Sequence, residues 1–393
     1  MKTLGLYMHM PFCKSKCPYC DFYSVTDNTD YRRYIDAMLL QMEDYASSAA
    51  PFTVDTIYIG GGTPSVVPEK LMFDLMDGVY RNFKVFIDAE TTIEANPATV
   101  TLGQLKKYRK MGINRISFGA QSMCDAELRA LSRLHSTEGF EKSFELARKA
   151  GFDNISVDLM YGIPEQTPKS LEESVARLSQ LGPEHISLYG LKIEPGTPFD
   201  AVKDTLKLPD EDSEYQMYEN SVAQLSSFGY KQYEISNFCK PGRECQHNMR
   251  YWHCGEYLGL GPGAHSYFNG NRFSFKKSIS DYITALEDPA ADIDLTDECY
   301  KISPEERVGE YIMLALRTTA GLDTAEFNRI FNLDFERMYH DLLAAYVEGG
   351  FMTHTSRGYA FTVKGMYVSN YILSSMLDFD SEIGRNIANG TDK

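Results

Sequence analysis

The chain carries the stretch YMHMPFCKSKCPYCD at residues 7–21, in which Cys13, Cys17 and Cys20 follow a C-x3-C-x2-C spacing. Three thiolates do not by themselves complete a structural zinc site, which normally has four protein ligands. They suit a 4Fe–4S cluster in which one iron has no protein ligand and is open to a chelating molecule. The spacing therefore predicts a 4Fe–4S cluster. The alternatives are unrelated loop thiols, or a zinc ion completed by a distant His or Cys.

Beyond this stretch, the first two-thirds of the chain alternate apolar runs with amphipathic stretches, which is typical of a parallel α/β protein. The expected strands are Leu4–Met10, Thr53–Gly60, Thr91–Asn96, Arg115–Ala120, Asn154–Tyr161 and His185–Ile193. The expected helices lie near residues 30–48, 68–82, 102–111, 125–133, 137–150 and 168–181. Six strand–helix repeats before Glu194 predict an open (βα)6 partial barrel of TIM type, with a closed eight-stranded barrel as the competing fold.

The pattern changes near residue 200 and divides the chain into three predicted parts. These are a partial-barrel core at residues 1–200, an accessory segment at 201–295, and a smaller, mainly helical, winged-helix-like domain at 296–393. In the accessory segment we expect a helix near 209–229, then a loop rich in Cys, His and Tyr, and a Gly-rich turn. The last domain is expected to hold three helices and a hairpin around Val347–Phe361, and the final dozen or so residues are expected to be disordered.

Composition is consistent with a cytoplasmic enzyme or carrier. The chain has 393 residues, 43% of them hydrophobic, and a net charge of −16, which argues against a sequence-independent grip on nucleic acid. Its eight cysteines are scattered without the dense spacing of a disulfide scaffold, so we expect reduced thiols. Neither a signal peptide nor a membrane-spanning stretch is expected, and membrane contact would be at most transient.

The cysteine motif and its flanks resemble the radical SAM superfamily. The pattern Tyr-x-His-x-Pro-Phe-Cys at residues 7–13 resembles its branch of coproporphyrinogen dehydrogenases and HemW heme chaperones. The resemblance implies that S-adenosylmethionine (S-adenosyl-L-methionine) binds the open iron, with Tyr19 against the adenine and Arg133 paired with the carboxylate. It also implies that the glycine run at residues 60–65 binds the amino group of that cofactor. The full set of implied contacts is Tyr7, Tyr19, Gly61, Gly62, Thr63, Glu94, Gln121, Arg133 and Asp158.

A second motif, QHNMRYW at residues 246–252, resembles the heme-binding motif of the HemW family. The resemblance implies heme contacts from His247, Asn248, Tyr251 and Trp252. Neutral imidazole is a common axial ligand of heme iron, so His247 is a candidate ligand, and the two aromatic rings are suited to a porphyrin. Cys245, His253 and Cys254 are further candidate ligands. A separate metal site at Cys239, Cys245 and Cys254 is disfavoured, because their spacings match no standard framework.

A Gly-rich stretch, GLGPGAHS at residues 259–266, follows the second motif. It is not a dinucleotide-binding fingerprint, because no βαβ unit surrounds it. The resemblance implies that this turn closes over the cofactor.

Two features bear on the function within this branch. In this family, proven coproporphyrinogen dehydrogenases have a C-x3-C-x2-C-x-C motif and an N-terminal arm. This chain has Phe22 at the position of the fourth cysteine, and it begins six residues before Tyr7. The resemblance therefore favours a heme chaperone that delivers heme to apo hemoproteins, such as respiratory or storage hemoproteins. It also implies a possible homodimer and, if the cluster is reduced, an electron donor. Alternative functions are oxygen-independent coproporphyrinogen III oxidase in porphyrin metabolism, and a methyltransferase or heme-degrading enzyme on the same scaffold.

Overall fold

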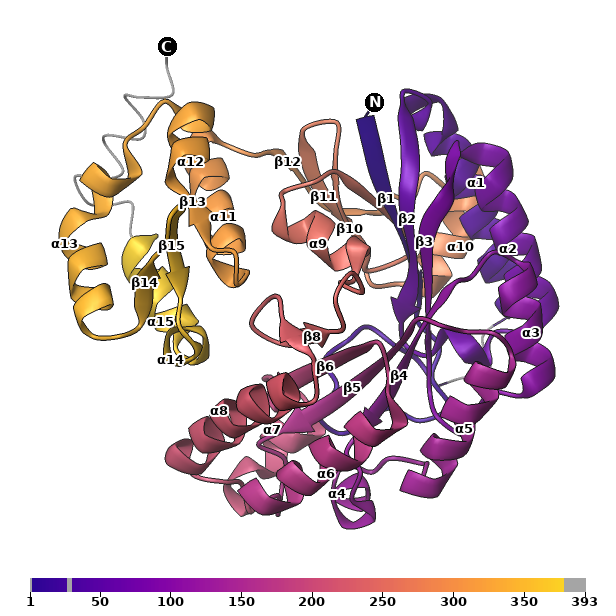
Figure 1. Cartoon of the computed structure of the whole chain (residues 1–393). Helices are drawn as coiled ribbons and strands as arrows, with labels where there is room; N and C mark the ends of the chain where they lie inside the picture. Colours follow the sequence, from indigo (N-terminus) through magenta and orange to yellow (C-terminus); the bar gives the residue numbers. More distant parts are fainter. Residues whose placement is uncertain (1, 27–29, 378–393) are drawn as a thin grey trace.

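Parallel strands in chain order form the centre of the fold (Figure 1). The structure is a computed structural model that describes residues 2–26 and 30–377. The central strands are β1 (Lys2–Met10), β2 (Phe52–Gly61), β3 (Val85–Ala95), β4 (Arg115–Gln121), β5 (Ile155–Tyr161) and β6 (His185–Gly190). Each pairs in parallel with the next, which confirms the predicted strands and their order. Their side chains are buried over most of their length, as expected of strands covered on both faces.

Helices connect these strands and cover the outer face of the sheet. They are α1 (Tyr31–Ala49), α2 (Glu69–Asn82), α3 (Leu102–Lys110), α4 (Asp125–Ala130), α5 (Thr137–Lys149) and α6 (Pro168–Leu181). Their ends follow local chemistry: Thr167 and Ser170 form a capping box at the start of α6, and Gly182 ends that helix with φ of +70°. Among the helices of the described residues, none combines the length and apolar composition that crossing a bilayer requires.

The barrel is open, because its first and last parallel strands do not pair with each other. On one side, β6 pairs antiparallel with β8 (Asn237–Cys239), which is followed by β7 (Lys231–Gln232). On the other side, β1 pairs with β9 (Tyr257–Leu260). The predicted open partial barrel is therefore confirmed, and the closed eight-stranded alternative is wrong.

Strands of the accessory segment, together with β12 at the start of the predicted C-terminal part, extend this sheet. Strands β9, β10 (His265–Phe268), β11 (Asn271–Phe275) and β12 (Thr296–Lys301) continue it in antiparallel pairs. We had not predicted this extension. The segment that we expected to be a Cys-, His- and Tyr-rich loop contains a helix, α9 (Gln246–Trp252), so that expectation was wrong. The seven-residue helix is short and its Cys245 N-cap makes no side-chain capping bond, which explains why no start signal marks it.

The C-terminal part has its own core and lies across the molecule from α1, α2 and α3 (Figure 1). Its helices are α11 (Pro304–Arg317), α12 (Thr324–Phe331), α13 (Phe335–Glu348), α14 (Val363–Tyr367) and α15 (Ser369–Met376). A small antiparallel sheet joins β13 (Leu322–Asp323), β15 (Gly358–Phe361) and β14 (Met352–His354), which gives the arrangement of a winged helix. The predicted hairpin is confirmed, but the segment holds five helices where three were predicted, because the short α14 and α15 follow the hairpin. The expected disordered end lies outside the described residues.

The remaining elements are short or connect these parts. Helix α8 (Glu211–Ser227) packs on α6, and α10 (Ile279–Glu287) packs on α1. The other elements are α7 (Pro198–Val202) and three 3-10 turns at Pro64–Val66, Lys203–Thr205 and Pro289–Ala291.

Candidate functional site

The predicted cofactor residues meet at the carboxyl ends of the parallel strands. The loop after β1 carries the three motif cysteines, the end of β2 and the turn after it contribute the glycines and Thr63, and β3 to β5 contribute one or more side chains each. All but one of the predicted residues line a cavity of about 160 Å³, which we call the cluster cavity. They are Cys13, Cys17, Tyr19, Cys20, Gly61, Gly62, Thr63, Glu94, Gln121, Arg133 and Asp158. This is the face at which barrel proteins assemble their active sites.

The three cysteines are free, half-buried thiols. Cys13 Sγ lies 3.5 Å from Thr63 Oγ1, and Arg133 donates from Nη1 to Cys17 Sγ at 3.3 Å. Among the described residues, no three His, Cys, Asp or Glu side chains converge on a single ion. The placement of the three thiols around one cavity is compatible with a cluster, because the cysteines that hold a 4Fe–4S cluster bind different irons around it.

The glycines at the end of β2 are required by the close approach of β1 and of the chain that leads into the cysteine loop. Gly61 has φ of +112°, and a Cβ there would lie 2.5 Å from the His9 ring. A Cβ at Gly62 would lie 2.7 Å from the Phe12 carbonyl oxygen. The backbone N–H of Gly62 instead donates to the Met10 carbonyl at 2.8 Å. The glycine run therefore fixes the start of the cysteine loop against β2.

Two carboxyl groups face the cluster cavity, Glu94 from β3 and Asp158 from β5, with β4 between these strands. Burial raises the pKa of Glu94 to about 7, although Tyr58 and the Gly61 N–H both donate to its carboxylate, at 2.8 and 3.0 Å. Burial also raises the pKa of Asp158, whose Oδ1 accepts from Ser117 at 3.4 Å. A cationic ligand between these two groups would favour their ionised forms and be held by them.

Arg133 connects the cysteines to the polar end of the cavity. Its Nη2 donates to Asn96 Oδ1 at 3.0 Å and to the Gly119 carbonyl at 2.8 Å. Its Nε is buried, and within the described part of the chain it has no hydrogen-bond partner. A buried unpaired donor beside the Cys17 thiol is compatible with a carboxylate ligand at this point. The donors and acceptors present therefore fit a cluster with S-adenosylmethionine.

A second cavity, of about 420 Å³, continues from the cluster cavity into the barrel, and we call it the barrel cavity. Arg115 lines it with only 2% of its surface exposed, and no hydrogen-bond partner of its side chain occurs within the described residues. His185 also lines it and bonds Ser156 and Tyr233 through its two ring nitrogens, each at 2.8 Å. We had assigned neither residue a role. A sequence signal could have found them: Arg115 and His185 are each the first residue of a mainly apolar strand, β4 and β6.

The motif at residues 246–252 forms helix α9, whose side chains face two different cavities. Asn248 lines the barrel cavity, whereas Tyr251 and Trp252 line a third space. His247 lies between them and is 1% exposed. Its Nδ1 bonds Thr56 Oγ1 at 2.9 Å and its Nε2 bonds the Tyr251 hydroxyl at 2.7 Å. Burial lowers the pKa of His247 to about 3, so the ring is neutral, but neither nitrogen is available to a ligand.

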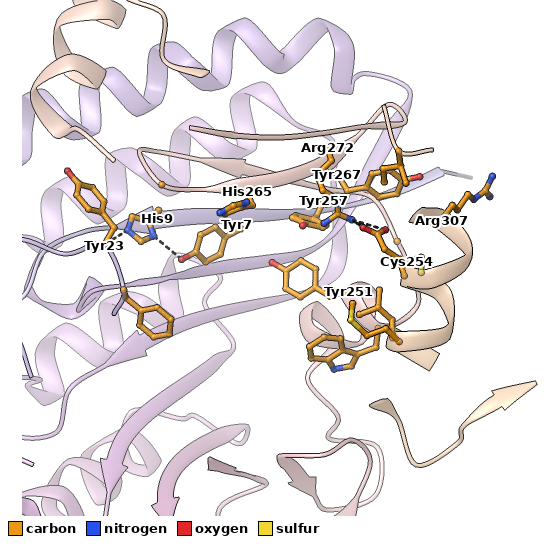
Figure 2. Close-up of a pocket in the computed structure, with 18 of the residues that line it drawn as sticks. Tyr7, His9, Tyr23, Tyr251, Cys254, Tyr257, His265, Tyr267, Arg272 and Arg307 are labelled. Carbon is orange, nitrogen blue, oxygen red and sulfur yellow. Dashed lines mark hydrogen bonds and ion pairs between the residues drawn. The ribbon is translucent and has the colours of Figure 1, made fainter. Parts of the chain in front are cut away.

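The third space is a cavity of about 540 Å³ between the extended sheet and α11, which we call the sheet–helix cavity (Figure 2). Aromatic side chains from β1, β9, β10 and α9 form much of its wall. Tyr7, the remaining predicted cofactor contact, lines this cavity and not the cluster cavity. Phe22 occupies the position of the fourth cysteine in the C-x3-C-x2-C-x-C motif. Its side chain is 69% exposed and lines all three cavities.

The other candidate heme ligands, Cys245, His253 and Cys254, differ in their access to the sheet–helix cavity. Cys245 is fully buried beside Glu90, at 3.7 Å, and His253 lines a groove on another part of the surface. Cys254 lines the sheet–helix cavity, and burial raises the pKa of its thiol to about 11. The described residues contain no metal-binding group that joins Cys239 to these cysteines. The Gly-rich stretch places Gly263 and His265 at the sheet–helix cavity.

Two domain families and several curated proteins match this chain. Residues 7–178 match the radical SAM superfamily, and residues 302–368 match the HemN C-terminal domain. A protein from Bacillus subtilis (strain 168) named heme chaperone HemW is 35% identical over 375 residues, covering 94% of this chain and 98% of that protein. A protein of the same name from Escherichia coli (strain K12) is 40% identical over 270 residues, covering 67% of this chain and 70% of that protein.

Among solved structures, coproporphyrinogen III oxidase (HemN) from Escherichia coli, described as a radical SAM enzyme, superposes with a TM-score of 0.84. The superposition covers 96% of this chain and 91% of that chain, at 23% sequence identity. The two proteins therefore share their fold, including the open barrel and the C-terminal domain.

Proposed function

Because the chain belongs to the HemW family of radical SAM proteins, we propose that it is a heme chaperone that binds heme and delivers it to apo hemoproteins. The observation that carries this proposal is the sheet–helix cavity, which Tyr251 and Trp252 of the heme motif line. Its volume of about 540 Å³ lies within the range of small-molecule sites, roughly 300–1,000 Å³. Its aromatic walls are suited to a flat, largely apolar macrocycle.

In this proposal, the cluster cavity holds a 4Fe–4S cluster on Cys13, Cys17 and Cys20. When bound, the cluster supplies an open iron for the amino and carboxylate groups of S-adenosylmethionine. Arg133 would direct its unpaired Nε to that carboxylate, and Tyr19 would pack on the adenine. The remaining predicted contacts are Gly61, Gly62, Thr63, Glu94, Gln121 and Asp158 at the cluster cavity, with Tyr7 at the sheet–helix cavity.

The heme motif would act through two kinds of contact. Tyr251 and Trp252 would contact the porphyrin directly, and Asn248 would contact ligands from the barrel side. We assign His247 a positioning role, because its ring nitrogens are occupied by Thr56 and by the Tyr251 hydroxyl. Removing the imidazole would free the Tyr251 side chain and disturb the cavity wall.

We also propose partners, a location and an assembly for this protein. The receiving partners would be respiratory or storage hemoproteins, reached from the cytoplasm with at most transient membrane contact. An electron donor would be needed if the cluster is reduced, and a homodimer is the expected assembly. Phe22 would separate the heme from the cluster, since its side chain lines all three cavities.

The test is an anaerobic absorbance titration of the cluster-reconstituted protein with hemin. We expect a saturable, stoichiometric Soret band that weakens in His247→Ala. His354→Ala is the matched control, because this histidine is 61% exposed on the C-terminal domain. Equal, non-saturating uptake of hemin by the wild type and both variants would contradict the proposal.

One observation favours a second function, oxygen-independent coproporphyrinogen III oxidase. The barrel cavity adjoins the cluster cavity, and its buried, unpaired Arg115 is suited to a substrate carboxylate such as a propionate. Turnover of coproporphyrinogen III by the anaerobically reconstituted, reduced protein would support this function. We expect no turnover, because this chain has Phe22 at the position where those enzymes have a fourth cysteine. Heme recovered unaltered after incubation with S-adenosylmethionine and a reductant would also argue against a methyltransferase or heme-degrading activity.

A further inference from the structure

The histidines at the sheet–helix cavity differ in the availability of their ring nitrogens. The His9 ring is buried, and it accepts from Tyr7 at Nδ1 and bonds the Tyr23 carbonyl through Nε2. The His247 ring, behind the wall, is likewise engaged at both nitrogens. His265 is exposed at the start of β10, and within residues 2–26 and 30–377 its ring has no hydrogen-bond or ion-pair partner. Of these three rings, only that of His265 is free to bind a ligand.

We infer that His265 is the axial ligand of heme iron in the sheet–helix cavity and that Arg307 binds a heme propionate there. The inference rests on the proposed function and names the residues by which that site holds its ligand. A neutral imidazole with a free nitrogen is a common axial ligand of heme iron. Heme ligation would thus come from the Gly-rich stretch and not from the histidine of the 246–252 motif.

Gly259 lets the backbone at His265 approach β9 closely. Gly259 of β9 pairs with Tyr7 of β1, and a Cβ at Gly259 would lie 2.3 Å from the His265 carbonyl oxygen. Gly259 therefore lies between these two residues and adds no side chain. Figure 2 shows the Tyr7 and His265 side chains over the sheet, with Tyr251 opposite on α9. In this inference, a porphyrin would lie among these side chains and be held by His265.

Helix α11 supplies the opposite wall and the cation. Arg307, Glu310, Met313 and Leu314 line the cavity from this helix, at a spacing that places them on one face. Arg272 also lines the cavity, but it is paired with Glu310 at 2.9 Å. Arg307 has no ion-pair partner within the described residues, so its guanidinium is available for a carboxylate.

Other side chains at the cavity are less suited to bind the iron. A thiolate, not a thiol, is the metal ligand, and burial keeps the Cys254 thiol protonated. The Tyr251 hydroxyl is engaged with His247, and the Tyr7 hydroxyl donates to His9. Met313 offers a weaker, thioether ligand. His265 is therefore the favoured ligand of the heme iron, because its imidazole is a good ligand and its ring is accessible from the cavity.

Ligation is tested on the full, cluster-reconstituted chain by titration with hemin, followed by absorbance and by EPR of the ferric complex. In His265→Ala we expect the Soret maximum and the EPR signal to change and the Kd for hemin to rise at least about tenfold. Added imidazole should restore the wild-type spectrum, because it replaces the missing ligand. The side chain is exposed, so we expect the variant to fold, and its far-UV circular dichroism and iron content check this.

Two controls separate this inference from the proposed function. His253→Ala removes an exposed histidine that lines a different groove, and we expect a wild-type spectrum and affinity. Wild-type Soret, EPR signal and affinity in His265→Ala would overturn the inference and leave the chaperone function standing. A wild-type protein that takes up no hemin stoichiometrically would overturn both.

The propionate contact is tested by comparing hemin with hemin dimethyl ester, whose propionates are blocked. Arg307→Ala should weaken hemin binding about tenfold to a hundredfold, as expected for a charge-assisted hydrogen bond, but leave binding of the ester nearly unchanged. Lys277→Ala is the matched control, because it removes another cation that lines the cavity. Equal losses for hemin and its ester in Arg307→Ala would overturn the assignment, and so would a loss confined to Lys277→Ala.

Discussion

At the scale of single residues, burial and partners decide which side chains are free for chemistry. His247 belongs to the motif that resembles a heme site, yet Thr56 and Tyr251 occupy its ring nitrogens. His265 belongs to a Gly-rich turn, and its ring is exposed at a cavity. Both are histidines with the same intrinsic ability to bind iron. The difference between them comes entirely from their surroundings.

Glu94 provides a pH-dependent prediction at this scale. Burial raises its pKa to about 7, so the carboxyl group is mostly protonated at pH 6 and mostly ionised at pH 8. A cationic ligand binds the ionised form better. We therefore expect the affinity for S-adenosylmethionine to increase about tenfold from pH 6 to pH 8, measured by anaerobic equilibrium dialysis on the cluster-loaded protein.

The control for this prediction is Glu94→Gln, which has an amide of similar size and no charge to titrate. Its affinity should be low and change little over the same pH range. A wild-type affinity that does not change between pH 6 and pH 8, or a Gln variant with the same pH dependence, would contradict the role of Glu94.

At the scale of elements, the end of β2 and the cysteine loop form one unit. The Gly62 and Thr63 N–H groups donate to the carbonyl groups of Met10 and Phe12, at 2.8 and 2.7 Å. These bonds fix the path of the chain just before Cys13. The glycine motif therefore has a packing role in addition to any contact with S-adenosylmethionine.

Gly61→Ala tests this packing role. Alanine at φ of +112° costs about 1–2 kcal/mol in backbone strain, and its Cβ would also overlap the His9 ring at 2.5 Å. We expect lower iron and sulfide content per chain after reconstitution, and a larger loss of unfolding free energy than strain alone produces. Gly151→Ala is the matched control, since Gly151 has φ of +94° and no neighbouring atom within 4 Å. Equal losses at the two positions would refute the packing role.

At the scale of the whole molecule, the C-terminal domain completes a cavity that the barrel begins. Helix α11 contributes one wall of the sheet–helix cavity, and Arg317 near its end reaches back to the accessory segment. Arg317 Nε lies 2.8 Å from Glu234 Oε2, and its guanidinium lies 4.5 Å from the centre of the Trp252 ring. One side chain thus connects the C-terminal domain to the heme motif.

Arg317→Ala should therefore loosen the domain as well as the cavity. Glu234 is fully buried, so removing Arg317 takes away its cationic partner and leaves only the hydrogen bonds from the Ser236 N–H and Asn237, at a cost of about 3 kcal/mol. We expect lower stability in urea unfolding, faster hydrogen exchange in α11, and weaker hemin binding. Arg329→Ala breaks an exposed pair with Glu326 and should cost less than about 1 kcal/mol. Comparable losses in the two variants would contradict this connection.

The parallel core was predictable because its signals are local. Apolar runs and amphipathic stretches predicted β1 to β6 and their helices with errors at the ends, such as β3, which begins at Val85 and not at Thr91. The short strands β9 to β12 and helix α9 were not predicted. Strand β9 pairs with the distant β1, and α9 is held by Thr56 of β2, so these two depend on contacts that leave little local periodicity, whereas β10 and β11 form a hairpin of very short strands.

The sequence by itself determined the open barrel and the cysteine motif, because these follow from spacing and periodicity along the chain, and the set of polar residues near the strand ends came from the family resemblance. Only the tertiary structure decided which of those residues face a common space. It placed Tyr7 in a different cavity from Cys13, and it enclosed His247 with Thr56, a residue 191 positions away. It also brought His265 and Arg307 to one cavity. Access and hydrogen bonding depend on contacts between distant segments, and no local pattern encodes those contacts.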